Sequence, residues 1–217
     1  GSLFLPSDVK DIPYYYADDI VEHKEGLSRK LSLIKRRLDL LGYNPGSLKQ
    51  HYEAHLSEVP DYYPNVPLSY EAFYSVVSNL DVSKITLDEE WGDYDPGEFL
   101  TKYLFKHPEF NKIHNLAEIT DKDIGSVFEN IDPYITLRIL AENPHNSDLD
   151  VFWGYADIVD NGWVQKEDIF NNVCAGQEFL VVTEGSSDTY ILKKAISHLY
   201  SDISDFFTFV DMEETYP

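Results

Sequence analysis

The stretch FLVVTEGSSDTYILKKAISHLY (residues 179–200), followed by the apolar segment FFTFVD (residues 206–211), decides the fold of the C-terminal part of the chain. It opens with apolar, partly β-branched residues, as in a strand that is buried on both faces. A Thr-Glu-Gly turn ends this strand, and apolar side chains at helical spacing follow it, with Ser186, Ser187 and Asp188 as N-cap candidates. Strand, helix and strand in this order predict a parallel βαβ unit.

Carboxylates follow both predicted strands. Glu184 ends the first strand, Asp188 lies at the start of the helix, and Asp211 and Glu213 end the second strand. Open parallel sheets bind ligands at the carboxyl ends of their strands, and oxygen ligands suit Mg²⁺ better than Zn²⁺. These four residues therefore predict a Mg²⁺ site, with Mn²⁺ as the alternative ion. In the competing interpretation, Glu184 stabilises a helix N-terminus and has no catalytic role.

The same residues resemble the start of a Toprim domain, the metal-dependent fold shared by primases, topoisomerases and nucleases of the overcoming-lysogenization-defect type. Glu184-Gly185 matches the glutamate and glycine that follow the family's first strand, and Asp188 matches an acidic residue that often opens the helix. The family's Asp-x-Asp pair follows the third strand, whereas Asp211-Met212-Glu213 follows the second. The resemblance implies that Glu184 is catalytic and that the chain ends before the remaining ligands of its site.

A second resemblance covers the upstream stretches RRLDLLGYNPGSLKQHYE (residues 36–53) and DIVDNGWV (residues 157–164). They are similar to HEPN/Toprim-associated proteins, in which a helical region precedes the Toprim part. The resemblance implies an α+β fold: a mainly helical HEPN-like domain over residues 1–146, then a β-hairpin and the first half of a Toprim-like α/β unit over residues 147–217. It also implies a Mg²⁺-dependent nuclease, hence a hydrolase, that acts on nucleic acid, DNA rather than RNA, in prokaryotic anti-phage defence or a toxin-like system. The 217-residue chain alone is expected to be inactive.

Composition indicates a folded protein, because 43% of the residues are hydrophobic and 14% are aromatic. The apolar runs are too short to cross a bilayer, and no charged leader with an apolar core opens the chain, so we expect no membrane association. The single cysteine, Cys174, excludes an internal disulfide and agrees with a reducing compartment. We therefore expect a cytoplasmic protein.

The net charge of −22, from 17 basic and 39 acidic residues, argues against simple nucleic-acid binding. Six basic residues nevertheless fall within one predicted helix, and four of them are the candidate phosphate contacts: Arg29, Lys30, Arg36 and Arg37. The alternative interpretation is a solvated helix face. A different function would be a non-catalytic acidic module that binds a protein partner or a second copy of the chain, and a third would be a negatively charged mimic of DNA.

Helical spacing and capping residues predict most of the upstream elements. The first predicted helix contains the basic residues from Lys24 to Arg37 and the apolar repeat from Leu27 to Leu41, and Gly42 ends it. Further helices are predicted over residues 48–58 (opened by Ser47), 70–80 (opened by Ser69) and 96–105, with two more within residues 116–140 (capped by Thr120 and Asp132) and a short one over 165–172. Prolines predict an extended segment over residues 3–16 and a loop over 59–67. Asn161-Gly162 is a hairpin signal and predicts two strands within residues 151–164.

Two further side-chain pairs have conceivable chemistry. His51 and His55 lie four residues apart in a predicted helix, a spacing that metal ligands can use, although such pairs are common in helices. Arg138 and His145 have the loosest spacing of the Arg-x(4–6)-His pattern of HEPN ribonucleases. Pro144 would break the helix on which that pattern depends. A structural role is the favoured interpretation of both pairs.

Overall fold

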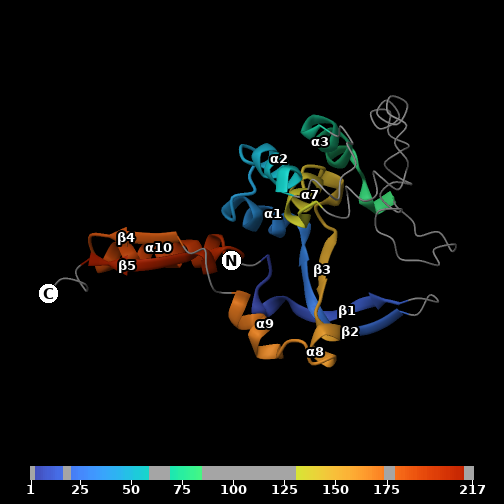
Figure 1. Ribbon diagram of the computed structural model, residues 1–217. Coiled ribbons are helices and arrows are strands. Elements are labelled where there is room, and N and C mark those ends of the chain that lie inside the picture. Colours follow the sequence, from blue (N-terminus) through green and yellow to red (C-terminus); the bar gives the residue numbers. More distant parts are fainter. Residues whose placement is uncertain (1–2, 17–20, 59–68, 85–130, 174–178, 213–217) are drawn as a thin grey trace.

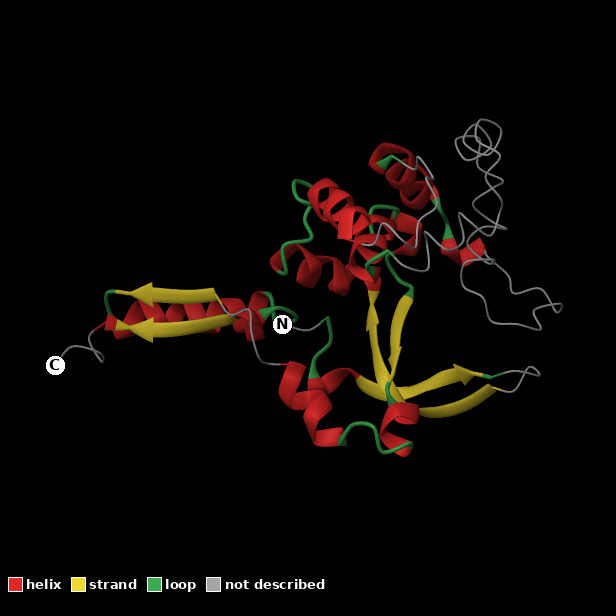
Figure 2. Ribbon diagram, in the orientation of Figure 1, coloured by secondary structure: helices red, strands yellow, loops and turns green. Residues whose placement is uncertain are grey.

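The computed structural model describes residues 3–16, 21–58, 69–84, 131–173 and 179–212, and confirms the predicted α+β class (Figures 1 and 2). The described residues fall into an N-terminal part (residues 3–173) and a C-terminal unit (residues 179–211). The predicted loop over 59–67, the helix over 96–105, the Thr120 cap and Glu213 lie outside the described residues. No described helix is long and apolar enough to cross a membrane.

An antiparallel sheet organises the N-terminal part, with strand order β1 (Val9–Tyr15), β2 (Val21–Lys30) and β3 (Asp150–Gly154). β1 confirms the extended segment predicted over residues 3–16, although a short 3₁₀ turn, η1 (Pro6–Asp8), precedes it. The strands approach closely at Gly26, where an added Cβ would lie 2.2 Å from Cδ1 of the buried Ile12. A side chain at this position would therefore overlap the packing of β1.

The basic segment is divided between a strand and a helix, so the prediction of one continuous helix is wrong. Lys24, Arg29 and Lys30 lie in β2, whereas Lys35, Arg36 and Arg37 lie in α1 (Leu31–Leu40). The reason is long-range pairing: β2 forms ladders with both β1 and β3, and the β3 ladder continues to Lys30. The helical spacing of the leucines did not contain this information.

Helices α1, α2 (Leu48–Glu58), α3 (Tyr70–Asn79) and α7 (Pro133–Leu140) gather at one end of the sheet, together with the 3₁₀ turns η2 (Val82–Lys84) and η3 (Pro144–Asn146) (Figure 1). The predicted C-terminal end of α1 and the predicted N-terminal caps of α3 and α7 are confirmed. Gly42 follows α1 with a φ of 95°, the Ser69 side chain accepts a hydrogen bond from the Ala72 N–H, and Asp132 caps α7.

Two clusters of buried side chains hold the N-terminal part together. One joins α2, α3 and α7 and includes the fully buried Phe73 and Ile135. The other joins α1 to the sheet and to α9 (Lys166–Val173) and includes Ile34, Leu38 and Ile169. Burial of such apolar surfaces is the main favourable term in folding. Both clusters connect segments that are far apart in the sequence.

The predicted hairpin at Asn161-Gly162 is wrong, because α8 (Ala156–Asp160) occupies its place. Gly162 has a φ of 73°, its N–H bonds the Val159 carbonyl, and the Trp163 N–H bonds the Ile158 carbonyl. These two bonds form a Schellman motif, a helix end that needs the same left-handed glycine as a hairpin turn. The hairpin of this fold is instead formed by β1 and β2. The predicted helix over residues 165–172 is confirmed as α9.

The C-terminal unit confirms the predicted βαβ order, with β4 (Phe179–Thr183), α10 (Ser186–Leu199), η4 (Ser204–Phe206) and β5 (Phe207–Asp211). The strands are parallel, and Thr183 pairs with Asp211. β4 is not buried on both faces as predicted, since Leu180 is 63% exposed. The expected side-chain cap is also absent from the described contacts, because Gly185 is the N-cap residue of α10.

Candidate functional site

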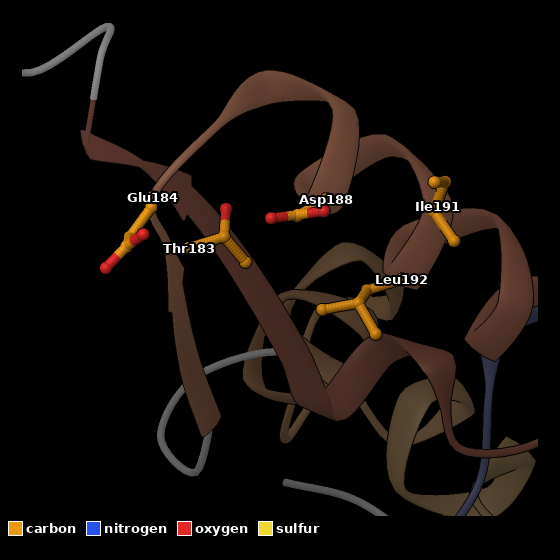
Figure 3. Close-up of a pocket in the computed structure, with 5 residues that line it drawn as sticks. All are labelled: Thr183, Glu184, Asp188, Ile191 and Leu192. Carbon is orange, nitrogen blue, oxygen red and sulfur yellow. The ribbon is translucent and has the colours of Figure 1, made fainter.

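A hollow of about 350 Å³ lies where β4 meets α10, lined by Thr183, Glu184, Asp188, Ile191 and Leu192 (Figure 3). Two of the predicted carboxylates, Glu184 and Asp188, line this hollow, because the turn between strand and helix is short. They do not converge. Figure 3 shows the Asp188 carboxylate directed toward Thr183, whereas the Glu184 carboxylate points away from Asp188 and out from the strand end. The side chains of both residues are exposed.

Asp211 lies beside the same strand end but on the face that the helix covers. Thr183 Oγ1 forms a short hydrogen bond with Thr189 Oγ1 of α10, so this face of β4 is directed toward the helix. Residues paired across parallel strands project from the same face, and Asp211 is paired with Thr183. Asp211 is accordingly buried. The three described carboxylates of the predicted metal site therefore point in different directions.

These carboxylates do not form a complete metal centre. Within the described ranges, no group of three or more His, Cys, Asp or Glu side chains could hold a metal ion. Oxygen-ligated ions such as Mg²⁺ require several ligands in a tight arrangement. The site has one outward-facing carboxylate at a strand end, Glu184, and two candidates, Asp188 and Asp211, that would have to reorient.

The four cations predicted to contact phosphate are all paired with carboxylates of the same chain. Lys30 bonds Asp150 at 2.8 Å, and Arg36 bonds Asp202 at 3.2 Å; both cations are about half exposed. Arg29 bonds Asp8 at 2.8 Å and Arg37 bonds Asp205 at 2.7 Å, and both arginines are buried. A phosphate contact by either buried arginine would require these ion pairs to break.

The two alternative pairs from the sequence have structural contacts. Arg138 is buried and donates to Asp39 at 2.7 Å and to Glu142, whereas His145 is exposed in the turn that Pro144 opens. His51 stacks on the Tyr43 ring, and its Nε2 lies 3.1 Å from the Gly42 carbonyl. Arg138 and His51 therefore hold the helices together.

Two polar clusters were not predicted from the sequence. Lys24 donates at 2.9 Å to both Tyr16 and Asp157, and its hydrogen bond, together with that of Tyr16, holds the pKa of Asp157 below its usual value. The second cluster is centred on Glu25, the residue after Lys24. Hydrogen bonds from Lys166, the larger effect, and from Tyr155 lower the pKa of Glu25.

These clusters attach α8 and α9 to β2. The bonds from β2 to Tyr155 and Asp157 join residues more than a hundred positions apart, so no local pattern could have revealed them.

The described residues thus define an α+β protein in which an antiparallel sheet with a helical layer precedes a parallel βαβ unit with an acidic strand end. A family model described as "HEPN/Toprim N-terminal domain 1" matches residues 1–177. Because this match covers most of the 217 residues, the chain belongs to that family, and the resemblance to HEPN/Toprim-associated proteins is confirmed. Searches of the curated proteins and of the solved structures gave no match.

Proposed function

We propose that the chain is part of a Toprim-type nuclease that acts on nucleic-acid phosphodiesters, DNA in preference to RNA, in prokaryotic anti-phage defence or a toxin-like system of the cytoplasm. One observation carries the proposal: Glu184 follows β4 in a parallel βαβ unit, in a chain of the HEPN/Toprim family. The carboxyl ends of parallel strands are the usual location of ligand and catalytic groups in open α/β sheets. The proposed catalytic group is the Glu184 carboxylate.

The proposed cofactor is Mg²⁺, with Mn²⁺ as a substitute, and Glu184 is the first proposed ligand. Asp188, Asp211 and Glu213 remain the candidate further ligands. One carboxylate cannot hold Mg²⁺ tightly against its hydration shell, and the described carboxylates diverge. Binding to the 217-residue chain should therefore be weak and should centre on the turn between β4 and α10.

Paramagnetic Mn²⁺ tests this proposal in the chain itself, because it broadens nearby amide NMR signals even when it binds weakly. We expect signals of residues 184–189 to broaden first, and the Glu184→Gln variant to lose this selectivity. Glu167→Gln is the matched control, since Glu167 is an exposed glutamate on α9. Broadening spread over the acidic surface, or broadening that Glu184→Gln leaves unchanged, would contradict the proposed metal site.

A cleavage assay tests whether the ligand set is complete. With Mg²⁺ or Mn²⁺, the chain alone should not cleave double-stranded or single-stranded DNA. Robust cleavage that Glu184→Gln abolishes would show that the carboxylates of the 217-residue chain suffice. In that case the proposed nuclease function would stand, and the proposed need for further ligands would be wrong.

The second candidate function is a non-catalytic acidic module that binds a protein partner or a second copy of the chain. The observation that favours it is the set of exposed apolar side chains on the C-terminal unit, including Leu180, Val182, Ile191 and Leu199. Self-association measured by light scattering that persists at high salt would support this candidate. Nucleic-acid binding that weakens steeply with salt would support the nuclease instead.

A further inference from the structure

The C-terminal unit contacts the N-terminal part through an acidic turn, residues 201–206, which connects α10 to β5 (Figure 1). Arg37 of α1 is the centre of this contact. Its Nη1 donates to the Asp202 carbonyl at 2.8 Å, and its Nη1 and Nη2 donate to the two carboxylate oxygens of Asp205, each at 2.7 Å. Two parallel N–H···O bonds of this kind are the most directional ion pair available to proteins.

Burial makes the Arg37 contact difficult to replace. The Arg37 side chain has no solvent exposure, and its guanidinium carbon lies 4.5 Å from the centroid of the buried Phe206 ring. A planar guanidinium can stack on a ring and form a two-pronged ion pair at the same time, whereas a lysine ammonium cannot. Loss of Asp205 would leave a buried cation without its carboxylate, which is strongly unfavourable.

Two neighbouring arginines extend the contact. Arg29 Nη2 donates to the Asp202 carbonyl at 3.2 Å, and Arg36 donates to the Asp202 carboxylate at 3.2 Å. With the Arg29–Asp8 pair included, three guanidiniums face three carboxylates. The cluster is therefore balanced in charge within the chain, which favours an internal joint over a site for an external anion.

We propose that Arg37 is a positioning residue that locks the C-terminal unit to the N-terminal part through the acidic turn, so that the two move as one body. The pair Arg37–Asp205 supplies the lock, and Arg36, half exposed and bound to a single carboxylate, is a secondary contact. This inference does not depend on the proposed nuclease function, because it concerns only the placement of the C-terminal unit.

Distance measurement between two spin labels tests the lock directly. The change Cys174→Ser removes the single cysteine of the chain. Spin labels can then be attached to cysteines introduced by Glu53→Cys in α2 and Lys193→Cys in α10, since both positions are exposed. The parent chain should give one narrow distance distribution. Arg37→Gln and Arg37→Lys should both lose the narrow peak and shift its mean, whereas the matched control Arg36→Gln should keep it.

Circular dichroism and a cooperative unfolding transition establish that each variant is folded. If Arg37→Gln does not fold, Asp205→Asn decides, since Asp205 lies in the turn and is partly exposed. A folded Arg37→Gln or Asp205→Asn chain that keeps the narrow parent distribution overturns the proposal. Because the readout is a distance, it succeeds or fails independently of metal binding and cleavage.

Discussion

The N-terminal part and the C-terminal unit place their apolar side chains differently. In the N-terminal part, apolar residues from α1, α2, α3 and α7 are buried in two clusters, and the charged side chains near them are paired. In the C-terminal unit, β4 and α10 keep apolar side chains in solvent, and the carboxylates of Glu184 and Asp188 at the strand end are exposed. The first region is stabilised by its own core, whereas the second depends on what it contacts.

The largest expected difference between the regions comes from truncating one apolar side chain in each. Phe73→Ala should lower the free energy of unfolding by about 3–5 kcal/mol, because Phe73 is fully buried and the change leaves a cavity. Leu180→Ala in β4 should change it by less than about 0.5 kcal/mol, because that side chain is mostly in solvent. Urea unfolding followed by circular dichroism measures both. A large loss for Leu180→Ala would show that a further segment or copy covers β4.

Glycine replacement gives a smaller contrast. Gly26→Ala should cost about 1–3 kcal/mol, because its Cβ would overlap Ile12 inside the sheet. Gly185→Ala should be close to neutral. No heavy atom lies within 4 Å of the added Cβ and the backbone is extended, so the loss of unfolded-state entropy favours the variant, whereas alanine is a poorer N-cap than glycine. Thermal unfolding of the two variants provides the comparison. A Gly185→Ala chain destabilised as much as Gly26→Ala would contradict the open surroundings of the turn after β4.

Removing a serine at a helix start should also destabilise the N-terminal part more than the C-terminal unit, by about 1 kcal/mol. Ser69→Ala removes the side-chain acceptor of the Ala72 N–H and should destabilise α3 by that amount. Ser187→Ala in the first turn of α10 should be close to neutral, because the N-cap there is Gly185. Denaturant midpoints of both variants measure this. Equal losses would indicate that Ser187 caps α10 after all.

The smallest effect concerns pH and the attachment of α9 to β2. Hydrogen bonds from Lys166 and Tyr155 lower the pKa of Glu25 below its usual value of 4.5. A lowered folded-state pKa stabilises the fold above the unfolded-state pKa, and this contribution is lost as the pH falls through the folded-state pKa. The parent chain should therefore be more stable than Glu25→Gln at neutral pH, and the difference should shrink below about pH 4.5. Unfolding measured from pH 7 to pH 3 tests this sign.

Most elements that the sequence predicted correctly are those whose deciding interactions are local. The Schellman end of α1 at Gly42, the Ser69 cap of α3, the Asp132 cap of α7 and the βαβ unit follow from neighbouring residues. The predictions failed where distant pairing decides. β2 continues to Lys30 because β3, from residue 150 onward, is its partner. Asn161-Gly162 supplied a left-handed glycine, which a hairpin and a helix end need equally.

For the candidate site, the sequence predicted which residues lie close together but not how their side chains are directed. Glu184 and Asp188 line one hollow because only three residues separate them around a short turn. Their divergent directions depend on side-chain rotamers and on the packing of Thr183 against Thr189, which composition and spacing do not contain. The pairing of Arg37 with Asp205 joins residues 168 positions apart and was equally out of reach.

The position of the arginine contact at one end of α10 makes this helix a lever arm. α10 has 14 residues and is therefore about 21 Å long. The acidic turn lies at its C-terminal end, whereas the hollow beside Glu184 lies at its N-terminal end, and both strands point away from the N-terminal part (Figure 2). If α1 rotated by about 10°, the Arg37 contact would carry the turn with it, and the Glu184 end would move through about 4 Å. A small adjustment of α1 would thus redirect the strand end without any direct contact between them.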